Sequence, residues 1–310
     1  AVESVGYLSD ARLLALNSYE NRVYQVGIED DVPLIAKFYR PQRWSEAQIL
    51  EEHHFSLELQ EADITVVAPL VDDHGNTLHC FQGFQFALFP RRGGNPPELD
   101  NLDNLLILGR TVGRIHAVGR AASFSERQQI TVDRMLTRNR EFLLEGFIPR
   151  ELIPAYESLT LDLLQTVESI YSDVQSQDLI RVHGDCHVGN ILWRDDTAHF
   201  VDLDDSCTAP AIQDLWMFLN GERHDRQLQL SELIEGYSEF CDFDPRQIRW
   251  IEALRTMRLI HYAAWLARRW EDPAFPRSFT WFNTERYWAD HILELREQMS
   301  ALQEEPLQLL

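Results

Sequence analysis

The segment HGDCHVGNIL, residues 183–192, decides how the rest of the chain is understood, because it crowds reactive side chains into a few positions. Four of them are residue types that bind transition metals: His183, Asp185, Cys186 and His187. On an extended segment alternate residues share a face, so His183, Asp185 and His187 could together hold zinc or iron. Cys186 and His187 would face opposite ways, which disfavours a Cys/His nucleophile. Both interpretations leave Asn190 without a role.

A third interpretation uses the spacing His183-x-Asp185-x4-Asn190, followed by the segment FVDLDD in which Asp202 comes after two apolar residues. This is the layout of a phosphotransferase catalytic loop. There one aspartate accepts the proton of the acceptor hydroxyl, while an asparagine and a second aspartate hold Mg²⁺ against the phosphates of ATP. Hard oxygen donors suit Mg²⁺ better than Cys or His. We therefore expect Asp185 and Asp202 to be catalytic, Asn190 and Asp202 to bind Mg²⁺, and ATP to be the co-substrate.

Such a site also requires a lysine on an N-terminal strand. Lys37 is the only lysine in a chain with 28 basic residues, and it lies in the strand-like run PLIAKFYR, residues 33–40. Arginine is a planar fork, whereas lysine is a compact point charge on a slim stem, so the two are not interchangeable at a phosphate. We expect Lys37 to contact the α- and β-phosphates of ATP.

A helix glutamate should hold this lysine in place. Residues 45–62 have helical spacing with Ser45 as a plausible N-cap, and Glu51 and Glu52 both lie within this helix. We prefer Glu52 to Glu51, because Glu52 lies near the apolar face of this helix, which includes Ile49.

The composition excludes several classes of function. The formal net charge of −22 argues against nucleic acid and anionic membranes as partners, since both attract basic surfaces. No apolar run approaches the ~20 residues of a membrane-spanning helix. The four cysteines are scattered and the N-terminus lacks the pattern of a signal peptide, so we expect a cytoplasmic protein with reduced thiols.

The pattern of residue types along the chain changes near residue 90. Before it, strand-like runs at 22–29, 33–40 and 83–90 surround the helix at 45–62. The segment PRRGGNPPELD, residues 90–100, is the best linker in the chain. Beyond it, helical patterns dominate, at about 102–120, 151–176, 214–220, 225–241, 246–270 and 284–303. Between 180 and 205 we expect two short strands instead, NILWR and HFVDLD.

Taken together, these motifs resemble the choline kinase and aminoglycoside phosphotransferase superfamily. HGDCHVGNIL has the H-G-D-x-H-x-G-N form, VDLDD replaces the D-F-G of protein kinases, and APAIQDLWMFL, residues 209–219, resembles the P-x-x-D-L element. Longer stretches, including LNSYENRVYQ and WLARRWEDPAFP, are similar to bacterial stress-response kinases. The resemblance implies a monomeric enzyme that phosphorylates serine and threonine, including on itself. It also implies that Asp214 caps a helix and braces the catalytic loop.

The implied fold is α+β and bilobal, like a protein kinase, with ATP between the lobes. We expect residues 1–90 to form a small β-rich nucleotide-binding lobe and residues 91–310 a larger helical catalytic lobe. The hinge is expected at about 89–95, with the backbone from Phe89 to Arg92 meeting the adenine.

The loop that should cover the phosphates departs from the usual pattern. Such loops are normally Gly-rich, because the backbone must approach the phosphates closely. Here the loop is LNSYENR, residues 16–22, without glycine. By resemblance to aminoglycoside phosphotransferases, Ser18 takes the phosphate contact, with Asn17 and Asn21 as the other candidates.

Two rival functions share these motifs. A small-molecule kinase for an aminoglycoside, a choline-like amine or homoserine would have the same ATP site, and the acidic charge permits a cationic acceptor. A catalytically inactive binding module is disfavoured, because Lys37, Asp185 and Asp202 are all present. Two features stay open. The segment HYAAWLARRW, residues 261–270, is either core with a solvated arginine face or part of the acceptor groove, and Asp204 and Asp205 are either acceptor-side charges or turn residues.

Overall fold

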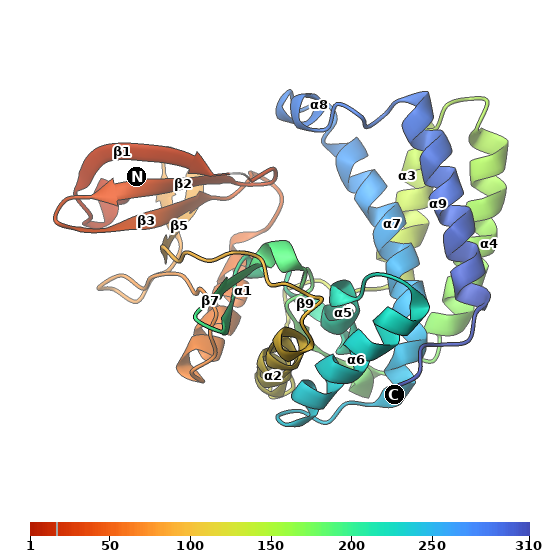
Figure 1. The fold of residues 1–310 in the computed structure, drawn as a ribbon. Coiled ribbons are helices and arrows are strands. Elements are labelled where there is room, and N and C mark those ends of the chain that lie inside the picture. The colour runs from red at the N-terminus through yellow and green to blue at the C-terminus, as the bar shows by residue number, and fades with distance from the viewer. Residues whose placement is uncertain (17) are drawn as a thin grey trace.

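The N-terminal part of the chain is an antiparallel sheet in the order β1-β2-β3-β5-β4 in the computed structural model, which describes residues 1–16 and 18–310 (Figure 1). The two predicted strands around residue 30 form a hairpin, and Asp30 turns it with φ 57°. All three predicted strands are present, and two further strands flank them. The five are β1 (Ser9–Leu16), β2 (Arg22–Ile28), β3 (Asp31–Phe38), β4 (His79–Phe81) and β5 (Phe84–Pro90).

Helix α1 (Glu46–Glu61) packs on this sheet and begins where its capping residues predict. The Ser45 hydroxyl accepts a hydrogen bond from the Gln48 N–H at 3.2 Å, and the Gln48 side chain accepts one from the Ser45 N–H at 3.0 Å. This reciprocal capping box satisfies two helix-end donors at once. The buried face of α1 includes Ile49 and Glu52, so the helix presents Glu52 inward.

The C-terminal part of the chain is helical, which confirms the α+β prediction. Helix α2 lies so close to α6 that a Cβ at Gly109 would be 2.1 Å from the Leu233 carbonyl oxygen. None of the helices among the described residues has the length and apolar character needed to cross a membrane. The helices are α2 (Leu102–Gly119), α3 (Arg138–Gly146), α4 (Ile153–Tyr171), α5 (Ile212–Leu215), α6 (Arg223–Ser238), α7 (Ile251–Arg268), α8 (Ala274–Ser278) and α9 (Glu285–Gln303).

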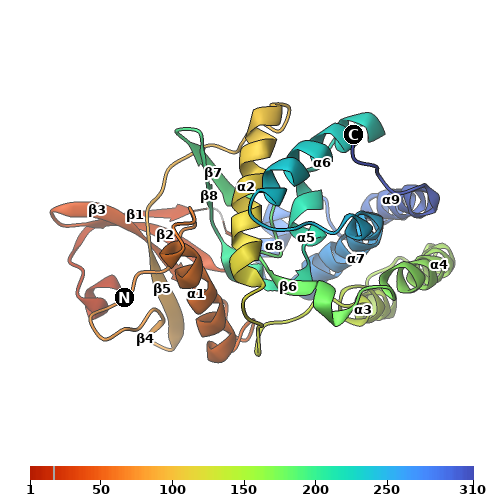
Figure 2. The same cartoon turned by 90° about the horizontal axis from the view of Figure 1, so that it is seen from below.

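Two further pairs of short strands follow. Strand β6 (Leu179–Val182) pairs with β9 (Cys207–Pro210), and β7 (Ile191–Arg194) pairs with β8 (Thr197–Phe200). The β7–β8 pair lies between the N-terminal sheet and α2 (Figure 2). The second predicted strand, HFVDLD, was placed too far along the chain. Strand β8 ends at Phe200, so the aspartates that follow lie in a turn.

The two parts of the chain are joined by the segment 91–101, which runs from β5 to α2. Its Asn95 forms an antiparallel bridge with Trp193 of β7. From the N-terminal side, the Val67 N–H donates to the Phe200 carbonyl at 2.9 Å. The hairpin β7–β8 is therefore fixed to both parts of the chain, immediately beside the predicted metal ligands.

Candidate active site

Asp214 holds the first turn of the segment 183–192. The N–H of His183 donates to its Oδ2 at 2.8 Å, and the N–H of Gly184 donates to its Oδ1 at 2.9 Å. Burial alone would raise the pKa of Asp214, but its hydrogen bond to His116, at 2.9 Å, and the main-chain donors keep that pKa below its usual range. Asp214 thus braces the loop, as the resemblance implied. It lies inside α5 and does not cap it, because the N-cap is Ala211.

Asp185 lies at the centre of three polar contacts. Asn190 Nδ2 donates to its main-chain carbonyl at 2.9 Å, His187 Nε2 lies 3.3 Å from Oδ2, and Arg258 Nη2 lies 2.7 Å from Oδ1. The N–H of Gly189 donates to His187 Nδ1, which assigns the ring proton to Nε2. Burial would raise the pKa of Asp185, but His187 and Arg258 outweigh it and hold the pKa well below the usual value. Asp185 is therefore a fully ionised acceptor.

Lys37 crosses from β3 to the turn after β8. Its Nζ lies 2.7 Å from Asp202 Oδ1 and 3.2 Å from Asp204 Oδ1. Burial would lower the pKa of Lys37, but the carboxylates of Asp202, Asp204 and Glu52 raise it above its usual value. The expected ion pair between Lys37 and Glu52 is not formed, because the two aspartates take the amine. Glu52 is instead a nearby buried carboxyl.

The structure separates the two helix glutamates. Glu51 accepts hydrogen bonds from the N–H groups of Ser125, Glu126 and Arg127 at 2.6, 2.8 and 2.7 Å, so it anchors that segment. Glu52 is buried, and burial raises its pKa to about 7 against the opposing charge of Lys37. Of these two glutamates, Glu52 is the one whose charge raises the pKa of the Lys37 amine.

The raised pKa of Glu52 predicts how stability depends on pH. A carboxyl whose pKa rises on folding stabilises the fold below its unfolded value, near 4.5, and loses that contribution as pH rises through about 7. Glutamine has no such dependence. The free energy of unfolding of Glu52→Gln, relative to the unsubstituted protein, should therefore increase by about 3 kcal/mol between pH 4 and pH 8. Urea denaturation without nucleotide measures it, and a difference independent of pH would refute the buried, titrating carboxyl.

Asp204 is a site residue whose role the sequence did not define. Its side chain is 3% exposed and also forms an ion pair with Arg43. Asn21 Nδ2 donates to Asp204 Oδ2 at 3.2 Å, while Asn21 Oδ1 accepts from the N–H of Arg40. Asn21 is thus a buried brace between the β2 start and the aspartate turn. In the sequence, the two adjacent aspartates at the end of VDLDD were the feature that could have indicated a role for Asp204.

The glycine-free loop is fixed to the C-terminal helices. Glu20 forms an ion pair with Arg269 and accepts a hydrogen bond from Trp265 Nε1. Ser18 lines a hollow of about 150 Å³ together with Phe275 of α8, so the structure places it against that helix. Asn17, the other candidate for a phosphate contact, lies outside the described residues.

Phe89 lies on β5 opposite Ile35, one residue before the strand ends. Its half-buried ring packs with Tyr39 and Ile49 and stands edge-on to His53, with the ring centroids 6.3 Å apart. The side chain thus belongs to the packing between sheet and α1. Its backbone leads directly into the connection to the C-terminal helices.

The oxygen donors of Asn190 and Asp202 fit a magnesium–nucleotide complex. Asn190 uses Nδ2 toward Asp185, which leaves its amide oxygen for another partner. Asp202 is held at φ 59°, unusual for a side chain other than glycine, and its carboxylate is 53% exposed. Mg²⁺ typically takes one or two protein oxygens and completes its shell with phosphates and water. Across residues 1–16 and 18–310, no group of three or more His, Cys, Asp or Glu is arranged for a metal, so the transition-metal interpretation gains no support.

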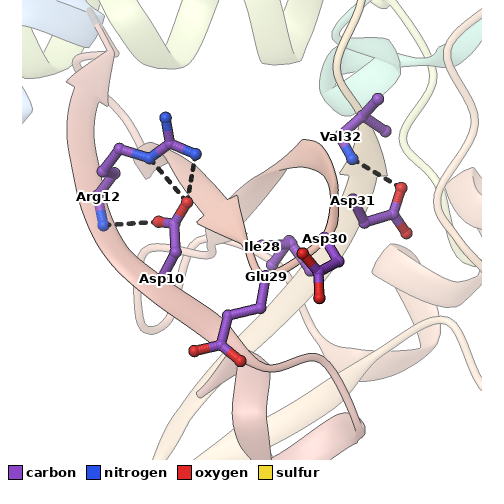
Figure 3. A pocket seen from close by; sticks show the side chains of 7 residues that line it. All are labelled: Asp10, Arg12, Ile28, Glu29, Asp30, Asp31 and Val32. Atoms are coloured by element: carbon purple, nitrogen blue, oxygen red, sulfur yellow. Dashed lines mark hydrogen bonds and ion pairs between the residues drawn. The ribbon is translucent and has the colours of Figure 1, made fainter.

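A larger hollow lies elsewhere, at β1 and the β2–β3 turn (Figure 3). Its volume is about 630 Å³, but it contains none of the predicted site residues. The Arg12 side chain pairs with Asp10 there, with Arg12 Nε 2.7 Å from Asp10 Oδ2. We therefore place the candidate site where the sheet meets the β7–β8 hairpin, not in this hollow.

A strand lysine, an H-x-D-x4-N loop and a following aspartate, joined across two lobes, define a kinase-like phosphotransferase. The sequence matches the description "Phosphotransferase enzyme family" over residues 12–251. It is 47% identical over 305 residues to stress response kinase A of Escherichia coli (strain K12), covering 98% of this chain and 92% of that one. It is 46% identical over 306 residues to "Serine/threonine protein kinase RdoA" of Salmonella typhimurium (strain LT2), with the same two shares.

Solved structures show the same fold. The amicoumacin kinase hAmiN, solved in complex with AMP-PNP, Ca²⁺ and Ami, matches with a TM-score of 0.76 at 18% identity. The match covers 96% of this chain and 92% of that one. The chain belongs to the phosphotransferase enzyme family, and the predicted bilobal kinase-like fold is confirmed.

Proposed function

We propose that the chain is an ATP- and Mg²⁺-dependent serine/threonine protein kinase of the stress response kinase type, able to phosphorylate itself. The observation that carries this proposal is the ion pair between Lys37 and Asp202 at 2.7 Å, which joins the two lobes beside Asp185 and Asn190. The name of the Salmonella typhimurium relative, a serine/threonine protein kinase, favours a protein acceptor over a small molecule. A monomer acting in the cytoplasm is part of the proposal.

The two lobes have different roles in this proposal. Residues 1–90 bind the nucleotide, residues 91–310 supply the catalytic loop and the acceptor surface, and the hinge lies at about 89–95. The end of β5 at Pro90 and the bridge from Asn95 to Trp193 support this division. The backbone at Phe89 contacts adenine, and Ser18 approaches the phosphates from the glycine-free loop.

Each remaining residue has one role in this proposal. Lys37 leaves the aspartates to contact the α- and β-phosphates, and Glu52 orients it. The oxygens of Asn190 and Asp202 hold Mg²⁺. When bound, the ion would neutralise charge on the phosphates and align them for in-line transfer.

Asp185 orients the acceptor hydroxyl by accepting its hydrogen bond. Because its pKa lies well below the usual value, Asp185 is ionised throughout the physiological range and is always ready to accept. The same low pKa makes it a weak base toward an intact alcohol. The hydroxyl proton therefore moves to the Asp185 carboxylate only as the bond from the acceptor oxygen to the γ-phosphorus of ATP forms and the bond from that phosphorus to the leaving ADP oxygen breaks. Positioning of the hydroxyl is thus the larger part of its contribution.

The acceptor class is tested with γ-labelled ATP. Purified protein is incubated with Mg²⁺, a generic protein substrate, and separately with an aminoglycoside, choline and homoserine. We expect label on serine and threonine of the chain itself and of the protein substrate. Label found only in a low-mass product would replace the proposal with a small-molecule kinase.

A further inference from the structure

One face of helix α7 holds only half-buried and exposed side chains, and its Arg258 contacts the catalytic loop. Residues three and four apart share a helix face, and Arg258, His261, Tyr262, Trp265 and Arg268 follow that spacing. Tyr262 is 43% exposed and its ring stacks on Trp265, with centroids 5.6 Å apart. The opposite face of α7 is core, with Ala253, Leu254, Met257, Ile260, Ala263, Ala264 and Ala267 all buried.

This face carries positive charge up to the catalytic residue itself. Arg258 Nη2 lies 2.7 Å from Asp185 Oδ1. Burial lowers the pKa of His261 to about 3, and the charges of four arginines add to that effect: Arg134, Arg268, Arg258 and Arg269. Asn139 joins two residues of this face, since its Nδ2 lies 3.0 Å from His261 Nδ1 and its Oδ1 accepts from Arg268. Positive charge therefore stands beside this imidazole in a chain whose net charge is −22.

Two of these arginines have no carboxylate partner. Arg269 pairs with Glu20, and Arg258 with Asp185. Neither Arg134 nor Arg268 has a carboxylate oxygen within 4.0 Å among residues 1–16 and 18–310. Arg268 instead donates to Asn139 Oδ1 at 2.6 Å.

Arg134 is the more notable of the two. It lies on the π-helical turn Asp133–Thr137, which packs on α7, and its side chain is partly buried. Burial lowers the pKa of its guanidinium. Single π-helical turns are rare and occur often at functional sites.

We propose that this face binds anionic groups of the protein substrate next to the acceptor serine or threonine, either carboxylates or phosphoryl groups. Guanidinium groups recognise both in the same bidentate manner. An exposed tyrosine beside arginines is typical of the central part of protein interfaces. A cationic acceptor would meet like charges immediately beside Asp185. The inference rests on the proposed protein kinase function and names its substrate class.

Matched serine peptides test the inference. Four peptides carry Asp, phosphoserine, Asn or Lys at every position within four residues of the serine and are otherwise identical. This length is needed because Arg268 lies ~15 Å along α7 from Arg258. We expect the Asp and phosphoserine peptides to have a KM about tenfold below that of the Asn peptide, and the Lys peptide a higher one. Added salt should raise the KM of the anionic peptides alone.

Variants identify the residues responsible. Arg134→Gln and Arg268→Gln should each raise the KM of the anionic peptides while leaving kcat and the Asn peptide unchanged. Arg134→Lys and Arg268→Lys should restore part of the preference, since the charge is kept. Arg286→Gln is the matched control, because that arginine is 91% exposed on α9. Turnover of the Asn peptide shows that each variant is folded.

The outcomes separate two failures. Equal KM values for the four peptides, or a preference for lysine, would overturn this inference and leave the protein kinase function standing. Phosphorylation of a small amine with no peptide or protein product would overturn both. A preference for phosphoserine over Asp would assign phosphorylated partners, and the reverse would assign acidic ones.

Discussion

Asp185→Asn is expected to lower the rate of phosphoryl transfer by about 10³-fold while nucleotide binding persists. Asparagine keeps the size of the side chain but cannot take the acceptor proton, and it removes the charge that pairs with Arg258. Label transfer from ATP measures the rate, and calorimetric titration with AMP-PNP measures binding. The loss should fall on kcat, because Asp185 faces the acceptor and not the nucleotide.

The matched control for this change is Asp196→Asn. Asp196 is exposed in the β7–β8 turn at φ 53°, a conformation that asparagine also accepts. The control should transfer phosphate at the rate of the unsubstituted protein. Transfer by Asp185→Asn at that same rate would remove Asp185 from the catalytic role.

Asp202→Asn is expected to lower kcat/KM for ATP by about 10³-fold, since bound Mg²⁺ contributes several kcal/mol to transfer. The metal should lose its charged ligand, so the Mg²⁺ concentration needed for half-maximal rate should rise. Lys37 keeps Asp204 as a partner at 3.2 Å, so the fold should persist. Steady-state rates over a series of Mg²⁺ concentrations measure the effect.

Comparing Asp204→Asn with Asp202→Asn distinguishes a residue that stabilises the fold from one that binds the metal. Asp204 is buried with Lys37, Arg43 and Asn21, so its replacement should lower the thermal midpoint clearly. Asp202 is half exposed, and its replacement should not. If both variants lost stability equally and both bound Mg²⁺ normally, Asp202 would be a structural residue and not a metal ligand.

The parts of the fold that could be predicted are those with local signals. Ser45 predicted the start of α1 as its N-cap, a signal that needs only neighbouring residues, and the structure adds Gln48 as its partner in a capping box. Strand β3 was recognised from its apolar run around Lys37. Strand β1 was missed, because six of its eight residues are exposed and show no alternation. Strands β6 and β9 are short and pair across the intervening β7–β8 hairpin, so no turn between them marks them in the sequence.

The site was predictable where chemistry dictates spacing. Asp185 and Asn190 lie on one loop, so the sequence carries their relationship, and the structure places the amide of Asn190 on Asp185. Two features depend on tertiary structure and could not be predicted. The pairing of Lys37 with Asp204 follows from the turn that Asp202 makes at φ 59°, and Arg258 reaches Asp185 from a distant helix.

The central claim is that Lys37, Asp185, Asn190 and Asp202 form one magnesium–ATP site. A crystal structure with AMP-PNP and Mg²⁺ tests it most directly. The account predicts a metal held by the oxygens of Asn190 and Asp202, with Lys37 moved from Asp202 to the phosphates and Asp185 facing the terminal phosphate. A nucleotide bound away from these residues, or a metal held by His183 and His187, would contradict it.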